Sequence, residues 1–294
     1  MLIIGAGAAG LMCAITAGQR GRRVLVVDHA NKVGKKILMS GGGRCNFTNL
    51  GTTPANYLSA NPHFAKSALA RYTPWDFIAL VEKHRIAWHE KELGQLFCDD
   101  SSKQIVRMLL DECAAAGVTV EANCAVQRVL RTPEGFSVHT ARGEVHAESL
   151  VVASGGLSIP SMGASGFGYE LARQFGHAVL PTRAGLVPLT LSGKHQEHYR
   201  DLAGVALPAV EARVGRQGFR AGLLFTHRGI SGPAILQISS YWQPGDDVRL
   251  DLLPDLDVGA WLVDQRTARP LAELKTVLGE VLPKRLAQRL CEQW

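Results

Sequence analysis

Blocks of apolar and polar residues at the start of the chain predict a strand, a helix and a second strand. Residues 1–4 form a short apolar run, and residues 8–20 favour a helix with one apolar side. Residues 24–27 then read Val-Leu-Val-Val and end at Asp28. An unbroken apolar strand is typical of a parallel sheet that is covered on both faces.

A loop-rich stretch at residues 34–62 is followed by two expected helices. The sequence Thr-Pro-Trp-Asp at residues 73–76 predicts a helix start, because it combines a capping threonine, a proline in the first turn and an acid three residues after the cap. That helix should end near His84. A second helix should span residues 101–117 and precede a short strand at 118–120.

The pattern changes at residues 125–153, which predict an antiparallel β-meander. Its three segments read AVQRVLRT, GFSVHT and EVHAESLVVA, with a glycine-containing turn after each of the first two. We expect the last segment to be one strand that runs directly into Ser154. A helix is expected at residues 169–176.

Prolines 181 and 188 suggest a boundary between two domains. We therefore place a first domain at residues 1–186 and a second, β-rich and then helical, domain at residues 187–294. Short strands are expected near 205–214 and 247–253, and a helical end from about Arg269. The fold class is α/β, with a Rossmann-like first domain.

Composition excludes several classes of protein. The chain has 46% hydrophobic and 20% charged residues, a net charge of +6 and a pI near 9.1, which permits attraction to phosphates without demanding nucleic acid. Six cysteines show no CxxC pair and no zinc-site spacing, so we expect a reduced, cytoplasmic protein without a metal site. No signal peptide or membrane span is predicted.

The turn between the first strand and helix carries the GxGxxG pattern of dinucleotide-binding proteins. Its glycines permit a tight turn, a close approach of the pyrophosphate and close helix packing, and the acid 18 residues later would accept hydrogen bonds from a ribose. An acid at that position disfavours NADP. The predicted cofactor contacts in this unit are Gly5, Gly7, Ala8, Ala9, Gly10 and Asp28.

The order of elements favours FAD over NAD as the bound cofactor. A β-meander follows where an NAD domain would continue strand, helix, strand, and this order resembles the glutathione-reductase-like FAD proteins. That resemblance implies that Ser154, Gly155 and Gly156 return to the cofactor and that the backbone of Val126 lies by the adenine.

Three strings make the resemblance narrower. They are Lys-Lys-Ile-Leu followed by SGGGRCNFTN at residues 40–49, GLVPL at 185–189, and LLFTHRGISGPAILQIS at 223–239. With these strings the chain resembles the BaiN/YhiN family of bacterial flavoproteins over nearly its whole length. The resemblance implies an FAD domain interrupted by a second domain, and NAD(P)H-linked reduction of conjugated carbon–carbon double bonds in substrates such as unsaturated steroid acids or ribosomal RNA uracil.

Members of that family continue with a Gly-rich strand and helix that close around the flavin. We therefore expect the sequence to be truncated after Trp294; the alternative is a natural fragment.

The SGGGRCN loop and one histidine are the candidates for cofactor contact and proton transfer. We expect the cofactor to contact Lys36, Gly42, Gly43, Arg44, Cys45 and Asn46. Cys45 and His227 are candidate catalytic acids; the alternatives are a packed thiol and a structural histidine. Arg44 has a surface ion pair as its alternative. No second GxGxxG is found, so NAD(P)H is expected to be a transient hydride donor.

Three functions remain open at this point. The first is an ene-type reductase of a small molecule, and the second is an RNA-directed flavoenzyme that reduces uridine to dihydrouridine in ribosomal RNA. Support for the second comes from the pI and from Arg213, Arg216, Arg220 and Arg228. The third is a flavin-binding module without turnover. The sequence predicts no oligomeric state.

Overall fold

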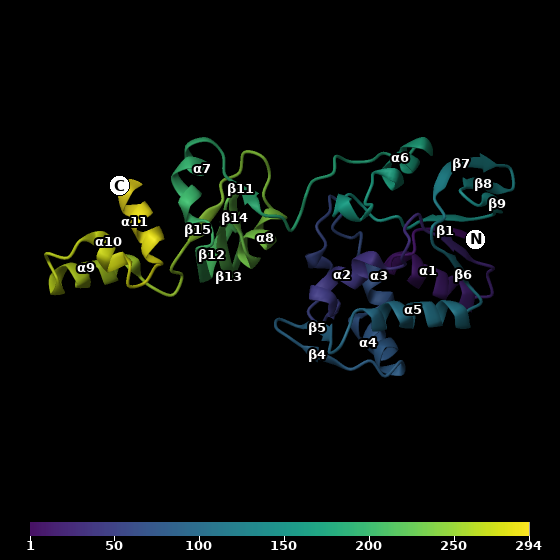
Figure 1. Cartoon of the computed structure of the whole chain (residues 1–294), viewed down its shortest axis with the longest axis horizontal. Coiled ribbons are helices and arrows are strands. Elements are labelled where there is room, and N and C mark those ends of the chain that lie inside the picture. The colour runs from purple at the N-terminus through teal and green to yellow at the C-terminus, as the bar shows by residue number, and fades with distance from the viewer. Residues whose placement is uncertain (294) are drawn as a thin grey trace. The chain divides into compact units, whose positions relative to one another are not determined.

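A computed structural model describes residues 1–293, and the chain divides into two compact units (Figure 1). The first unit is Met1–Leu180 and the second begins at Pro181. The division falls a few residues before the boundary that the sequence suggested at residue 186.

A four-stranded parallel sheet is the centre of the first unit, with strand order β10-β1-β2-β6. Its strands are β1 (Leu2–Ile4), β2 (Leu25–Val27), β6 (Thr119–Glu121) and β10 (Leu150–Val152). At the carboxyl edge of the sheet, β1 is followed by the turn at Gly5, β2 by Asp28, and β10 by the segment with Ser154. Ligands of open α/β sheets bind at this edge.

Helices cover one face of this sheet and the meander covers the other. Ile3 packs with α1 (Ala8–Gln19) and α5 (Lys103–Ala115), which lie side by side, whereas Leu2 and Ile4 pack with the meander. Successive strand residues point to opposite faces. Burial on both faces therefore explains the unbroken apolar run in the sequence.

The meander forms a separate three-stranded sheet, β7-β8-β9. Its strands are β7 (Val126–Thr132), β8 (Gly135–Thr140) and β9 (Gly143–Ala147). The expectation of one long last strand is wrong, because β10 is a separate strand that pairs with β1. Glu148 and Ser149 turn the chain from one sheet to the other, and the Ser149 carbonyl accepts from the Leu2 N–H at 2.9 Å.

A third sheet and several short helices lie between β2 and β6. The sheet order is β3-β5-β4, with β3 (Asn46–Asn49), β4 (Trp88–Glu90) and β5 (Gln95–Cys98). The helices are α2 (Lys35–Met39), η1 (Ser40–Gly43), η2 (Pro54–Asn56), α3 (Lys66–Arg71) and α4 (Pro74–Lys83). The predicted capping threonine of α4 is confirmed, since the Thr73 hydroxyl accepts from the Asp76 N–H at 3.3 Å. The stretch expected to be mostly loop thus contains α2 and β3.

After β10 the first unit ends with η3 (Pro160–Met162) and α6 (Phe167–Gln174).

The second unit has a five-stranded sheet of order β11-β14-β13-β12-β15. Its strands are β11 (Leu189–Thr190), β12 (Ala206–Val214), β13 (Gln217–Thr226), β14 (Gly229–Ser231) and β15 (Arg249–Asp251). Its helices are α7 (Gly193–Tyr199), η4 (Arg200–Leu202), α8 (Pro233–Ser239), α9 (Val258–Ala268), α10 (Leu274–Leu278) and α11 (Lys284–Gln293).

The helical end of the second unit starts earlier than expected, because α9 precedes the predicted start near Arg269. Among the helices that the structure describes, none has the length and apolar character needed to cross a membrane.

Candidate functional site

The turn from β1 to α1 requires glycine at two positions. A Cβ on Gly10 would lie 1.9 Å from the carbonyl oxygen of Gly5, and Gly5 has φ +110° with a Cβ position 2.3 Å from the carbonyl oxygen of Ala153. A Cβ on Gly7 would meet no atom within 4 Å. Gly5 and Gly10 therefore serve the packing of the turn, while Gly7 keeps open the space in front of it.

The start of α1 presents backbone donors towards that open space. Ala8 and Ala9 are exposed at the first turn of this 12-residue helix, and the first N–H with an intrahelical acceptor is that of Leu11, which donates to the Gly7 carbonyl at 3.0 Å. The N–H groups before Leu11 have no acceptor inside the helix. Together with the helix dipole they suit a pyrophosphate.

Asp28 closes the same turn from the end of β2. Its carboxylate accepts from the Ala6 N–H at 2.7 Å and from the Ala30 N–H at 2.8 Å. Each carboxylate oxygen has a second lone pair, so a ribose hydroxyl can still donate to this group. The turn is therefore held by an acid that the sequence predicted only as a ribose contact.

A cavity of about 420 Å³ opens beside Asp28 at the carboxyl edge of the sheet. Gly5, Val126 and Ser154 also line it, so the structure brings together four residues that the sequence predicted from three separate segments. Gly163 lines it too, with φ +91° and a Cβ position 2.8 Å from Nε2 of His29. Contacts of this cavity with a ribose at Asp28 and an adenine at Val126 stay predictions.

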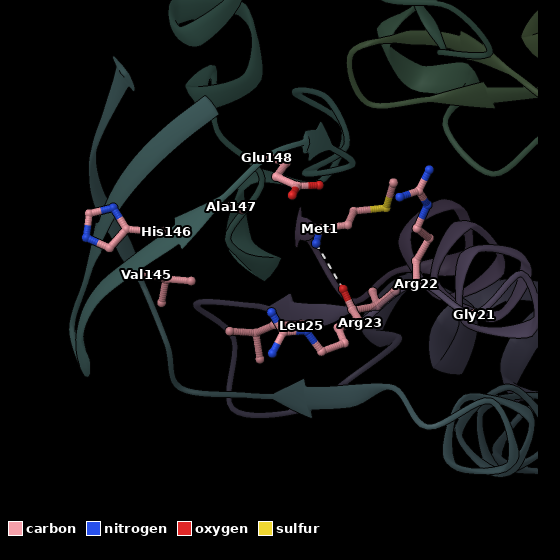
Figure 2. A pocket seen from close by; sticks show the side chains of 10 residues that line it. Met1, Gly21, Arg22, Arg23, Leu25, Val145, His146, Ala147 and Glu148 are labelled. Atoms are coloured by element: carbon pink, nitrogen blue, oxygen red, sulfur yellow. Dashed lines mark hydrogen bonds between the residues drawn. The ribbon is translucent and has the colours of Figure 1, made fainter. Parts of the chain in front are cut away.

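Another cavity, of about 550 Å³, lies at the opposite, amino edge of the sheet (Figure 2). Arg22, Arg23, His146 and Glu148 line it, and the Met1 amino group donates to the Arg23 carbonyl at 2.9 Å. None of the predicted cofactor contacts is among its lining residues. The two cavities are therefore separate features of the first unit.

The Ser40–Asn46 loop has a backbone that only a glycine-rich sequence adopts easily. Gly41, Gly42 and Gly43 have φ of +59°, +65° and +89°, and Cys45 has φ +56°. Positions for a Cβ on Gly42 and Gly43 face open space, so these two residues expose their backbone. Successive N–H groups in such a conformation form a concave surface that can bind an anion.

Backbone hydrogen bonds hold this loop to its neighbours. The Cys45 N–H donates to the Ser40 carbonyl at 3.0 Å, and the Cys98 N–H donates to the Arg44 carbonyl at 3.0 Å. Ser102, just before α5, donates its N–H to the Gly43 carbonyl at 2.7 Å and its hydroxyl to the Leu38 carbonyl at 2.9 Å. The loop is thus a fixed part of the fold. The sequence pattern indicated Ser102 only as a possible helix start and not as a support of this loop.

The thiol of Cys45 is buried, with 5% of the residue exposed. Burial raises its pKa, and the side-chain hydrogen bond with Ser40 opposes this only in part. Burial also raises the pKa of the neighbouring Cys98 to about 11, with the charge of Cys45 as the next cause. Cys45 is therefore a neutral thiol at physiological pH, which suits proton donation or packing and not nucleophilic attack.

Lys36 joins the loop region to the segment after β10. Its Nζ donates to the Ser158 hydroxyl at 2.7 Å and lies 3.7 Å from the Cβ position of Gly155. A Cβ on Gly156 would lie 2.8 Å from the hydroxyl of Tyr169, a neighbour that the sequence did not indicate. Lys36 is thus close to Gly155, and its contact with a phosphate stays a prediction.

Arg44 and Asn46 are exposed next to Cys45. Within residues 1–293 the Arg44 side chain has no ion pair or hydrogen bond, so the surface ion pair considered above is not formed there. His227 is exposed in the turn between β13 and β14 of the second unit, where the Thr226 hydroxyl accepts from the Arg228 N–H. Catalytic roles for Cys45 and His227 remain predictions.

Comparison with known proteins identifies the family of the chain. The model of the HI0933-like protein Rossmann domain matches residues 1–235, and that of the HI0933-like protein barrel and H2TH domain matches residues 183–294. A ribosomal RNA dihydrouridine synthase of Escherichia coli (strain K12) is 59% identical over 98% of this chain and 72% of its own length.

Two further relatives cover the chain equally well. A ribosomal RNA dihydrouridine synthase of Haemophilus influenzae is 49% identical, and a 3-dehydro-bile acid delta(4,6)-reductase of Clostridium scindens is 29% identical. Each match covers 99% of this chain and 74% of the relative. The resemblance found in the sequence strings and the α/β fold with a Rossmann FAD domain are confirmed. The chain belongs to the HI0933-like family of FAD-dependent oxidoreductases.

Proposed function

We propose that the protein reduces a carbon–carbon double bond conjugated to a carbonyl group, with NAD(P)H as the electron source and FAD as the bound carrier. The observation that supports this is the pair of substrate types named in its relatives, a uridine of ribosomal RNA and a 3-dehydro-bile acid with delta(4,6) bonds. Forming dihydrouridine saturates a double bond next to a ring carbonyl. The steroid bonds named in the other relative are likewise conjugated to an oxo group.

The reaction adds one hydride and one proton across the double bond, and NAD(P)H supplies the hydride and becomes NAD(P)⁺. When bound, FAD supplies the hydride transfer. The chain must then hold the substrate and deliver a proton to the carbon next to the carbonyl. The SGGGRCN loop is suited to both tasks, because Arg44 and Asn46 offer exposed polar groups beside a buried, protonated thiol at Cys45.

Cys45 is the proton donor that the geometry of the first unit favours. Its thiol is protonated at neutral pH, and its backbone is fixed by the hydrogen bond to Ser40. His227 is the alternative acid and is carried by an exposed turn of the second unit. A proton donor must be in position when the hydride arrives, and the fixed loop provides that for Cys45.

A uracil of ribosomal RNA is the substrate that the identity of the relatives favours. The two relatives named for it are 59% and 49% identical to this chain, whereas the bile acid reductase is 29% identical. A small conjugated enone remains the second candidate substrate.

Anaerobic reduction followed by reoxidation tests the proposal. The flavin of the purified protein should lose its absorbance with NADH or NADPH and regain it on addition of a substrate. We expect recovery with a conjugated enone or with ribosomal RNA that lacks dihydrouridine, and not with the saturated analogues. A protein that neither binds FAD nor is reduced by either nicotinamide would contradict the proposal.

A further inference from the structure

The segment after β3 exposes an unusual number of aromatic rings. Every residue from 55 to 64 is exposed, and Ala65 is the first buried residue. Phe64 is 70% exposed and Trp75, at the start of α4, is 63% exposed; Tyr57 and Tyr72 are exposed as well. Large apolar side chains exposed this close together in the sequence indicate an interaction site.

Neighbouring aromatic residues of the same unit behave differently. Phe47 on β3 packs against Phe77 with ring centroids 6.0 Å apart and meets Trp88 edge-on at 6.4 Å. In the described part of the chain no such ring contact involves Phe64 or Trp75. The core therefore uses its own set of rings and leaves this second set for a partner.

Charge along this part of the chain indicates the partner. Residues 29–75 contain no Asp or Glu, although the chain has 26 in all. They contain six basic residues: Lys32, Lys35, Lys36, Arg44, Lys66 and Arg71. The first acid after Asp28 is Asp76, whose carboxylate accepts from the Thr73 N–H at 2.6 Å as a helix cap. A partner that is both flat and negatively charged fits this combination.

Single-stranded nucleic acid has those two properties. Its bases stack on exposed aromatic rings with little sequence preference, and its phosphates are attracted to lysine and arginine. Lys66 and Arg71 are the first and last residues of α3, which lies between the two rings in the sequence. Both side chains are exposed, and neither is in an ion pair among residues 1–293. Sequence-specific RNA recognition mostly uses unpaired regions, where bases can be splayed out and stacked on aromatic side chains.

The exposed segment also follows shortly after residues 40–46, the loop expected to contact the cofactor and here called the cofactor loop. β3 begins at Asn46, directly after Cys45, and the chain then leads to η2 and the exposed residues. The turn between them is anchored, because the Leu50 N–H donates to the Gly94 carbonyl at 2.9 Å. The chain therefore leads from Cys45 to the exposed rings through one short strand and an anchored turn.

We propose that residues 55–75, here called the aromatic segment, bind single-stranded RNA on either side of the base to be reduced. This rests on the uracil form of the proposed function. Phe64 and Trp75 stack on bases, and Lys66 and Arg71 contact phosphates. Arg44 contacts the nucleotide whose base is reduced.

Binding of a fluorescent single-stranded oligouridylate to the full chain tests this inference. We expect Phe64→Ala and Trp75→Ala each to weaken binding about tenfold, because stacking of one base on one ring is lost. The double variant Lys66→Glu/Arg71→Glu should weaken binding further and reduce its salt dependence. A matched control, Arg22→Glu/Arg23→Glu, makes the same charge change at the amino edge of the sheet (Figure 2) and should have the smaller effect.

The outcomes separate this inference from the proposed function. Unchanged RNA binding in the aromatic variants, or a larger loss in the Arg22/Arg23 control, would overturn the docking surface. So would binding of the segment to anionic phospholipid vesicles, or self-association through it, without any effect on RNA. Reduction of a small enone is measured in parallel on the same variants. Weakened RNA binding with retained enone reduction in these variants is the expected result. A parent protein that reduces the enone but does not bind the oligouridylate removes the inference and leaves the reductase. A parent protein that binds the oligouridylate but whose flavin is not reduced contradicts the proposed function and leaves the RNA binding.

Discussion

The cofactor loop at residues 40–46 and the exposed run at residues 55–64 lie only eight residues apart, and both have the composition of a loop. The first is held by hydrogen bonds from Cys45, Cys98 and Ser102 and has its thiol buried. The second is exposed at every residue. The first region is thus suited to a reaction that needs fixed geometry, and the second to the RNA partner proposed above.

The largest effect is expected in the glycine turn between β1 and α1. Gly10→Ala should destabilise the apoprotein by about 3 kcal/mol, because its Cβ position is 1.9 Å from a backbone oxygen that cannot move aside. Urea unfolding without flavin measures this. Gly7→Ala is the matched control, since its Cβ meets nothing within 4 Å.

Gly7→Ala should unfold within about 0.5 kcal/mol of the parent and yet retain less FAD, because its methyl group occupies the space for the pyrophosphate. Equal stability of both variants would show that the turn tolerates a side chain at either glycine.

The next largest effect concerns Cys45 in the fixed loop. Cys45→Ala should lower turnover about 10²-fold with FAD still bound, because the proton donor is lost. Since burial raises the pKa of this thiol, the parent should keep its activity from neutral pH up to at least pH 9, where an ordinary thiol is half ionised, and lose it only above that. Steady-state rates across pH measure both effects.

Cys98→Ala is the control, because Cys98 is a buried thiol in the same cluster without a place in the loop. It should lower stability and leave turnover nearly unchanged. Full turnover in Cys45→Ala would assign the thiol to packing and move the proton donor to His227.

The sequence predicted those parts of the fold that local pattern determines. The spacing of apolar residues and of glycines predicted β1, α1 and β2. The Thr73 cap predicted the start of α4. Four residues predicted to contact the cofactor line the cavity beside Asp28, because strand ends of a parallel sheet meet at one edge; their contact with a cofactor stays a prediction.

Other features depend on contacts between distant segments. The chain leaves the meander at Glu148 because β10 pairs with β1, which no local pattern shows. Left-handed φ at Cys45 and the hydrogen bonds from Ser102 arise from packing of the loop against α5. Exposure of Phe64 and Trp75 was not predicted, since a single aromatic residue reads equally well as core.

A smaller effect is expected where a side chain of α5 binds the end of α4. The buried Glu112 carboxylate accepts from Lys83 at 2.6 Å and contacts His84 at 2.7 Å. Glu112→Gln should cost about 1–2 kcal/mol of unfolding free energy, reduced from a fully buried pair because Lys83 is mostly exposed. Asp111→Asn, in the exposed pair with Arg107, should cost less than about 0.5 kcal/mol.

Acid should remove the Glu112 contribution. Hydrogen bonds from Lys83 and His84 hold the pKa of Glu112 below its ordinary value of 4.5, so its stabilisation is complete above that pH and declines as the pH falls through the lowered value. Thermal unfolding from pH 7 to pH 3 should therefore show the difference between parent and Glu112→Gln shrink on acidification. A constant difference would place the effect in packing.

The smallest effect compares one substitution in both regions. Ser102→Ala removes a buried hydroxyl that donates to the Leu38 carbonyl beside the cofactor loop, and should cost about 1 kcal/mol. Ser59→Ala removes a hydroxyl that accepts from the Asn61 N–H at 3.1 Å in the exposed run, where water replaces it, and should cost less than about 0.5 kcal/mol. Urea unfolding and hydrogen exchange of the loop amides measure both. Faster exchange at Cys45 in Ser102→Ala alone is expected, because only that hydroxyl supports the loop; equal exchange in the two variants would mean that the backbone bonds hold the loop without it.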